Sequence, residues 1–217
     1  MSGNELASDQ PEVFEFSEEN QKLIEGIIAK YPEGRQASAV IPLLDIAQRQ
    51  HENWLPKVAI EKVAEILDMA PIRVLEVATF YTMFNLKPVG KYFLQACTTT
   101  PCWLRGSDEI MRCIKDRYGI ISGQTAACGR FSLLEVECLG ACVNAPILQV
   151  NDDFYEDLDY ETTGALLDSL ESDDPLPVGS VIGRSGSEAS GGGTTLAAVK
   201  AGKTNKSTSK KQGSAHA

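Results

Sequence analysis

The chain has 217 residues, with 20 basic and 30 acidic side chains, and 43% of its residues are hydrophobic. This length can bury the core of one moderate domain or two small ones, and the hydrophobic share argues against wholesale disorder. No apolar run approaches the roughly 20 residues of a membrane-spanning helix, so we expect no direct membrane span. The acidic start has the layout of neither a signal peptide nor a mitochondrial presequence, which favours a cytosolic-type compartment.

Charge is unevenly distributed along the chain. Residues 176–217 carry six basic and one acidic side chain, a net charge of +5, which leaves a net charge of −15 on residues 1–175. Because nucleic-acid phosphates repel such a body, we expect no nucleic-acid binding. An acidic surface instead suits solubility or contact with a basic partner surface.

The chain has two histidines, His51 and His216. Their scarcity leaves little room for Ser–His–Asp or Cys–His catalytic sets, or for metal sites rich in histidine. His51 lies in a helix-like stretch without a thiol or carboxylate motif around it, so we expect a surface or capping role. Cysteine is therefore the residue most suited to carry chemistry here.

The first half of the chain is predicted to be helical. Residues 1–16 form a flexible polar leader, and residues 17–87 form a small helical bundle that serves as a scaffold or docking surface. Ser17 can cap the first helix, and Pro42 and Pro71 are acceptable only in a first turn. The apolar spacing predicts four helices, at residues 17–31, 39–50, 56–69 and from Pro71 onward.

The periodicity changes after residue 88. Residues 88–172 read as strand, helix, two or three strands and a final helix, the order of a thioredoxin-like α/β domain. The predicted strands cover residues 92–96, 131–137, 146–150 and 154–155, and the helices cover residues 103–118 and 162–170. The fold class is therefore α+β, a helical bundle followed by an α/β domain.

The last segment, residues 173–217, is predicted to be a disordered tail rich in Gly, Ser and Lys. Residues 176–217 contain no aromatic residue, and 19 of these 42 residues are Gly, Ser or Thr. Such a segment buries too little apolar surface to offset its chain entropy.

Four of the six cysteines form two close pairs, Cys97/Cys102 with C-x4-C spacing and Cys138/Cys142 with C-x3-C spacing. Each pair lies where a predicted strand ends in a turn. Two pairs of thiolates suit a [2Fe–2S] cluster, in which each pair binds one iron. The threonines between Cys97 and Cys102, with the backbone N–H groups around them, can donate hydrogen bonds to the cluster sulfides. A four-cysteine zinc site and disulfides remain alternatives, although disulfides fit poorly with a cytosolic-type chain.

The two other cysteines are expected to be bystanders. Cys113 lies on a predicted helix and reads as a buried thiol, and Cys128 precedes a glycine in a turn and reads as a spare thiol. A thioredoxin-type redox role requires C-x-x-C, which is absent from the sequence.

Several spaced motifs together carry a family resemblance. They are Tyr81-Thr-Met-Phe-Asn85, Pro88-Val-Gly-Lys-Tyr92, Cys97-x4-Cys102-Trp-Leu-Arg-Gly106, Val136-Glu-Cys-Leu-Gly-Ala-Cys142 and Asn144-Ala-Pro146. Over roughly residues 14–170 the chain resembles the thioredoxin-like [2Fe–2S] subunit of NADH-quinone oxidoreductase, which is designated E in bacterial respiratory complex I. It departs from the family pattern at Cys128-Gly129, where family members commonly have Asp-Gly, and in its long tail.

The resemblance implies that Cys97, Cys102, Cys138 and Cys142 bind one [2Fe–2S] cluster. It implies a partner flavoprotein subunit that holds FMN and oxidises NADH, further iron–sulfur subunits of the peripheral arm, and a place on the cytoplasmic side of the bacterial inner membrane or the mitochondrial matrix side. The expected work is electron transfer, with no bond chemistry on a substrate by this chain. The sequence contains no G-x-G-x-x-G loop, so NADH and flavin are expected on the partner.

Three alternatives stay open. The first is the equivalent subunit of an NAD-reducing hydrogenase or an NAD-dependent formate dehydrogenase, with the same chemistry in another assembly. The second is a stand-alone thioredoxin-like ferredoxin, which gives the helical bundle no purpose. The third is a zinc-stabilised interaction module.

Overall fold

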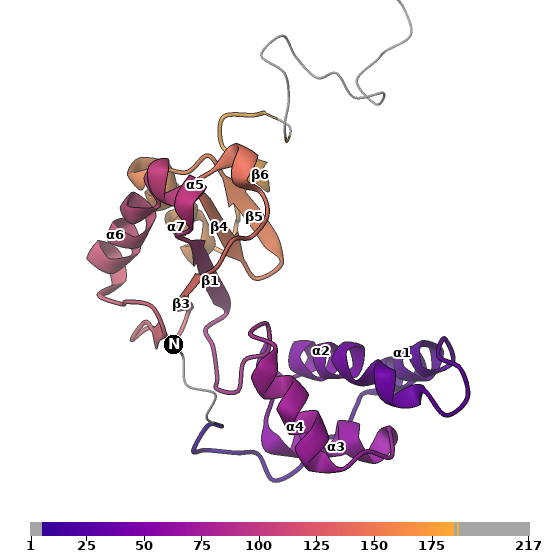
Figure 1. Cartoon of the computed structure of the whole chain (residues 1–217). Helices are drawn as coiled ribbons and strands as arrows, with labels where there is room; N and C mark the ends of the chain where they lie inside the picture. The colour runs from indigo at the N-terminus through magenta and orange to yellow at the C-terminus, as the bar shows by residue number, and fades with distance from the viewer. Residues whose placement is uncertain (1–5, 185, 187–217) are drawn as a thin grey trace, which may run out of the picture.

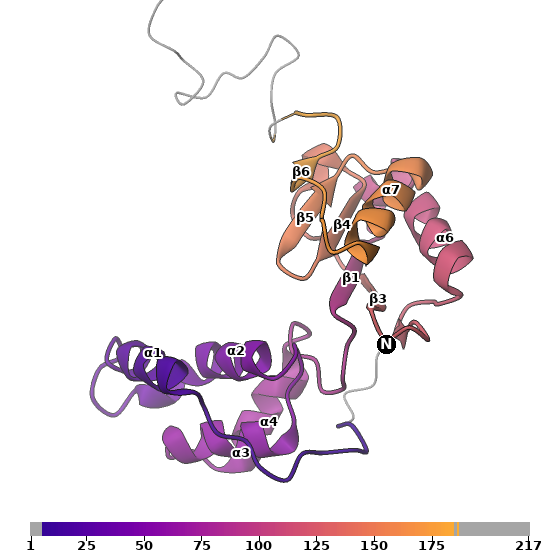
Figure 2. The same cartoon turned by 180° about the vertical axis from the view of Figure 1, so that it is seen from behind.

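The computed structural model describes residues 6–184 and 186. The first half is helical, and the second half combines helices with a mixed sheet (Figures 1 and 2). The α-helices are α1 (Glu18–Ile28), α2 (Val40–Gln50), α3 (Lys57–Ile66), α4 (Pro71–Phe80), α5 (Thr100–Leu104), α6 (Ser107–Tyr118) and α7 (Tyr160–Glu171). The strands are β1 (Tyr92–Cys97), β2 (Gln124–Thr125), β3 (Phe131–Val136), β4 (Ile147–Val150), β5 (Asp153–Glu156) and β6 (Gly179–Ser180), and the 3-10 turns are η1 (Gln36–Ala39) and η2 (Cys142–Asn144).

The four-helix prediction for the first half is confirmed. Ser17 caps α1, and its hydroxyl accepts a hydrogen bond from the Asn20 backbone N–H at 3.2 Å. Pro42 lies in the first turn of α2 and Pro71 opens α4, the positions where proline disturbs no helical hydrogen bond. The helices surround one apolar core, whose fully buried members include Leu43, Leu44, Val63 and Val74.

The leader differs from the prediction of a flexible segment. Phe14 and Phe16 are buried in the helical core, and their rings meet edge to face with centroids 5.0 Å apart. The Ala7 backbone N–H also donates to the Leu86 carbonyl at 3.0 Å. Residues 6–16 therefore belong to the packed structure, and the boundary placed at residues 87 and 88 stays a prediction.

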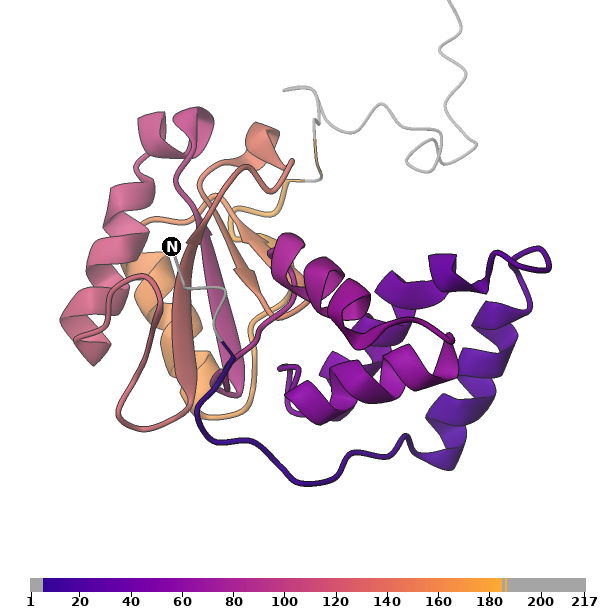
Figure 3. The same ribbon diagram turned by 60° about the horizontal axis from the view of Figure 1, so that its bottom comes forward.

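Within the described residues, six strands form one sheet in the order β2-β3-β1-β4-β5-β6. The central pair β1 and β3 is parallel, joined by α5 and α6, while β4 pairs antiparallel with both β1 and β5. The expected order of strand, helix, two or three strands and helix is present, and the short strands β2 and β6 are additions that the sequence did not predict. Helices α6 and α7 pack together on one face of the sheet, and the helical half lies on its other side (Figure 3).

Two details of the second half differ from the predictions. The single helix expected at residues 103–118 is two helices, because Gly106 adopts the left-handed region, with φ +98°, between α5 and α6. Residues 173–184, which the prediction assigned to the disordered tail, are ordered instead, since β6 pairs with β5. Residues 187–217 lie outside the described residues.

None of the helices among residues 6–184 has the length and apolar character required to span a bilayer.

Candidate metal centre

Strand register brings the two cysteine pairs to the same end of the sheet. Cys97 is the last residue of β1 and pairs with Val136, the last residue of the parallel strand β3. Because parallel neighbours end at the same edge, the loop that follows Val136 begins beside Cys97, and Cys138 lies two residues into that loop. This edge carries α5 and lies away from helices α1–α4 (Figure 1).

The first pair is buried. Cys97 ends β1, Cys102 lies in α5, and both are almost fully removed from solvent in a small cluster with Ala145 and Ile147. The Cys97 Sγ lies 3.2 Å from the Thr99 Oγ1. Thr99 thus contacts a cysteine sulfur, whereas hydrogen bonds from the threonines to the sulfides of a cluster stay a prediction.

The pKa values of the two thiols in the first pair are shifted in opposite directions. Burial by itself raises the pKa of Cys97, but hydrogen bonds from the Thr99 hydroxyl and from the Leu139 and Thr99 backbone N–H groups outweigh it, so this pKa lies below its ordinary value. Burial raises the pKa of Cys102 to about 12, and the neighbouring Cys97 sulfur adds to the shift. One thiolate is therefore favoured in the pair, with the other thiol as its donor.

The second pair lies at the surface. Cys138 is exposed, Cys142 in η2 is half-buried, and their Sγ atoms are 3.2 Å apart as free thiols. The hydrogen bond from Cys142 and the Gly140 backbone N–H lower the pKa of Cys138, while donation to Cys138 raises the pKa of Cys142. Gly140 adopts φ +86°, a conformation that favours glycine and allows the short turn between the two thiols.

Thr99 and Leu139 connect the two pairs. The Thr99 hydroxyl lowers the pKa of Cys138 as well as that of Cys97, and the Leu139 backbone N–H, from the second loop, lowers the pKa of Cys97. Cys102 and Cys142 are close enough for their charges to interact. The sequence indicated the threonines and the backbone N–H groups around them as donors to cluster sulfides. It carried no signal for the Leu139 amide of the second loop, because a backbone N–H leaves no residue pattern.

The sequence left two metal centres open for the four paired thiols, a zinc site and a [2Fe–2S] cluster. Among residues 6–184 and 186, no three cysteine, histidine or carboxylate side chains converge tightly enough to hold a single metal ion. A structural zinc site needs four ligands around one point, whereas each iron of a [2Fe–2S] cluster takes two thiolates. Two thiol pairs at the same end of the sheet match this two-by-two ligation, and Cys97, Cys102, Cys138 and Cys142 as the ligands stay a prediction.

The other candidate residues stand apart from the four thiols. Cys113 is fully buried in α6, where burial raises its pKa, and Cys128 is exposed in the turn between β2 and β3. His51 caps the C-terminal end of α2, with its ring 4.7 Å from that of Trp54. His216 lies outside the described residues.

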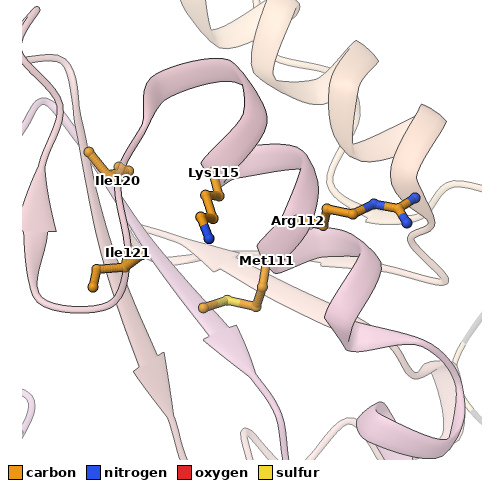
Figure 4. Close-up of a pocket in the computed structure, with 5 residues that line it drawn as sticks. All are labelled: Met111, Arg112, Lys115, Ile120 and Ile121. Carbon is orange, nitrogen blue, oxygen red and sulfur yellow. The ribbon is translucent and has the colours of Figure 1, made fainter.

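One shallow cavity lies elsewhere on the domain, between α6 and the segment after it. Its lining residues are Met111, Arg112, Lys115, Ile120 and Ile121 (Figure 4). The Arg112 guanidinium points away toward α7 and lies 4.8 Å from the centroid of the Tyr160 ring. None of the four paired cysteines lines this cavity, so it is no part of the candidate metal centre.

Comparison with known proteins identifies the family of the chain. The model of the thioredoxin-like [2Fe–2S] ferredoxin family matches residues 24–171. The NADH-quinone oxidoreductase subunit designated E in Rickettsia bellii is 58% identical over 160 residues, which cover 74% of this chain and 96% of that protein. The mitochondrial NADH dehydrogenase (ubiquinone) flavoprotein 2 of Dictyostelium discoideum is 50% identical over 183 residues, covering 84% of this chain and 74% of that protein.

A solved structure shares the fold. The NAD+-reducing [NiFe]-hydrogenase in its air-oxidized state superposes with a TM-score of 0.54 at 21% identity, over 61% of this chain and 23% of the hydrogenase chain. At that identity the likeness concerns the fold alone. By the family match and the identities above, the chain belongs to the thioredoxin-like [2Fe–2S] ferredoxin family, in the group formed by the corresponding subunits of NADH-quinone oxidoreductase.

Proposed function

We propose that the chain is the electron-transfer subunit of an NADH-quinone oxidoreductase and binds one [2Fe–2S] cluster through Cys97, Cys102, Cys138 and Cys142. The carrying observation is the register of Cys97 with Val136, which places two thiol pairs at one edge of the sheet in a chain 58% identical to a subunit of that complex. When bound, the cluster accepts and releases one electron at a time.

The chain's own groups set the environment of this centre. The Thr99 hydroxyl and the Leu139 and Gly140 backbone N–H groups donate to cysteine sulfur, which disperses negative charge on the thiolates. Burial of the first pair excludes water on one side, whereas Cys138 leaves the other side open. The exposed pair is therefore the side at which we expect electron exchange with a partner protein.

Large apolar side chains flank the exposed side. Trp103 and Leu104 in α5 are 58% and 70% exposed, and Val143 in η2 is 53% exposed. Exposed apolar side chains around a functional site indicate a surface that another protein covers. We assign this surface to the partner flavoprotein subunit that holds FMN and NADH, in an assembly with further peripheral-arm iron–sulfur subunits.

The identities favour this assembly over its alternatives. The hydrogenase likeness is one of fold at 21% identity, against 58% identity to the Rickettsia bellii subunit of NADH-quinone oxidoreductase. The same assignment places the chain as a peripheral subunit on the cytoplasmic side of the bacterial inner membrane, or on the matrix side in a mitochondrion. A zinc-stabilised module is disfavoured by the match to the thioredoxin-like [2Fe–2S] ferredoxin family and by the 58% identity to a subunit of NADH-quinone oxidoreductase.

Co-expression with the flavoprotein subunit tests the proposed function. NADH should then reduce the cluster of this chain, seen as a reduced-state EPR signal, and the two subunits should co-purify. Leu104→Ser should weaken the association, whereas Leu23→Ser, on the exposed face of α1, should leave it intact. Co-purification with hydrogenase or formate dehydrogenase subunits instead would contradict the assignment.

A further inference from the structure

The segment after α7 forms a strap across the edge of the sheet. It is anchored at its start by Asp173, whose Oδ1 accepts hydrogen bonds from the Lys91 Nζ at 2.6 Å and the Tyr92 hydroxyl at 2.8 Å. Its strand β6 pairs with β5, and Leu176 and Val181 pack on the core of the α/β domain. This strap, residues 173–184, lies beyond the residues 24–171 that the family model matches.

Arg184, at the far end of the strap, joins a buried carboxylate to the cysteine loop. Its Nε donates to the Asp157 Oδ2 at 2.9 Å, and its Nη2 donates to the Asp157 Oδ1 and to the Val143 carbonyl at 2.8 Å. The Asp157 side chain is only 3% exposed, so its charge requires a partner. Val143 directly follows Cys142 in η2.

Other hydrogen bonds also hold the loop around Cys142. The Ala145 N–H donates to the Cys142 carbonyl at 3.3 Å, and the Asn144 Nδ2 donates to the Glu156 Oε2 at 2.6 Å. The Asn144 N–H donates to the Ala141 carbonyl at 3.0 Å, and the Asp157 N–H donates to the Asn144 carbonyl at 2.8 Å. Asp157 thus bonds the loop through its backbone and bonds Arg184 through its side chain. The Ser180 hydroxyl donates to the Asp157 Oδ2 at 2.6 Å and fixes the same carboxylate from within the strap.

Asp157 thus contacts both the strap and the loop, and Arg184 of the strap contacts both Asp157 and the loop. Burial by itself raises the pKa of Asp157, but the hydrogen bonds from Arg184 and Ser180 outweigh it and hold the pKa below its ordinary value. The carboxylate is therefore ionised near neutral pH, and its bonds to the guanidinium are charge-assisted.

We propose that Arg184 is a positioning residue that ties the strap to the second cysteine pair and fixes the loop carrying Cys142. Its relevance to the cluster rests on the proposed ligand set, whereas its action on the loop stands on the hydrogen bonds alone. Its positive charge, placed on the carbonyl next to Cys142, also favours the reduced state of a bound cluster.

Hydrogen exchange of the full chain without iron tests the positioning role. Arg184→Gln should accelerate exchange of the Asn144 and Asp157 amides about tenfold, because a hydrogen bond to a charged group is lost. The matched control is Arg117→Gln, since Arg117 pairs with Asp168 in the same domain and has the same 35% side-chain exposure. That control should leave both amides at the wild-type rate.

The conservative variant separates charge from geometry. Arg184→Lys keeps the positive charge, but its single ammonium group cannot reproduce the forked contact with both Asp157 and Val143. The loop amides should therefore still exchange faster than in the wild type. In iron-loaded protein, the midpoint potential should become more negative in Arg184→Gln and stay near the wild-type value in Arg184→Lys.

Wild-type exchange of the loop amides in Arg184→Gln would overturn the proposal, and so would equal acceleration in Arg117→Gln. Full protection in Arg184→Lys would overturn the forked bridge. Because the exchange is measured without iron, these results are independent of the ligand assignment. That assignment fails separately if the wild-type chain binds no cluster.

Discussion

The Arg49 guanidinium in α2 holds the Asp152 carboxylate, in the turn between β4 and β5, through two hydrogen bonds of 2.6 and 3.1 Å. This pair joins the helical half of the chain to its sheet. The side chains are 53% and 68% exposed, so the pair adds little free energy of unfolding. Its planar, two-bonded geometry instead orients one half against the other.

A double-mutant cycle of Arg49→Gln with Asp152→Asn should give a coupling energy of about 0.2–1 kcal/mol in urea unfolding at pH 7. The hydrogen bond from Arg49 lowers the pKa of Asp152. A lowered folded-state pKa means that the coupling is complete above the unfolded-state pKa of about 3.9 and declines as pH falls toward the folded value. A coupling that grows in acid would contradict this account, and high salt should weaken it at any pH.

Gly90 lies close against the backbone at the start of β3. A Cβ at this position would lie 2.7 Å from the Arg130 carbonyl carbon and 2.8 Å from the Phe131 nitrogen, both in backbone that cannot easily move. Gly90→Ala should therefore destabilise the protein by about 1–3 kcal/mol in urea unfolding. Gly26→Ala is the control, because Gly26 lies in α1 with open space around it, and there alanine should stabilise by up to about 1 kcal/mol. Equal effects of the two substitutions would contradict the close approach.

The four proposed ligands should react unequally with iodoacetamide in iron-free protein. Cys138 is exposed and has a lowered pKa, so it should be alkylated first among the four. Cys102 is buried with a pKa raised to about 12, so it should react last, together with the buried bystander Cys113. Peptide mapping by mass spectrometry measures the order, and exposed Cys128 reports the rate of a thiol outside the site. Early alkylation of Cys102 would contradict the buried first pair.

The cluster is expected to have a low reduction potential. Residues 1–175 carry a net charge of −15, which disfavours the addition of an electron. A redox titration of the isolated chain should give a clearly negative midpoint potential, which rises with ionic strength as salt screens the surface carboxylates. A clearly positive value would contradict the prediction.

The sequence predicted secondary structure correctly where the pattern depends on neighbouring residues. Proline and serine positions predicted the starts of the helices, and the alternation around Phe131 predicted β3, because such patterns depend on neighbouring residues. The cysteine pairs followed strand ends, so their convergence was predictable once β1 and β3 were taken as neighbours.

The missed features depend on contacts between distant residues. The polar composition of residues 1–16 gave no indication that Phe14 and Phe16 are buried. Their burial requires the helical core that residues 17–87 supply. Composition alone predicted that the whole segment from residue 173 is disordered. Arg184 in that segment nevertheless binds the Asp157 carboxylate, 27 residues earlier in the chain. A single arginine in a Gly- and Ser-rich segment carries no local signal for such a partner.

Iron and acid-labile sulfide analysis, joined to EPR after dithionite reduction, tests the central claim most directly. The wild-type chain should contain two irons and two sulfides and give a reduced-state signal. Cys138→Ala should lose the cluster, and the matched thiol deletion Cys113→Ala should keep it. One zinc per chain with no EPR signal, or a normal spectrum from Cys138→Ala, would contradict the account.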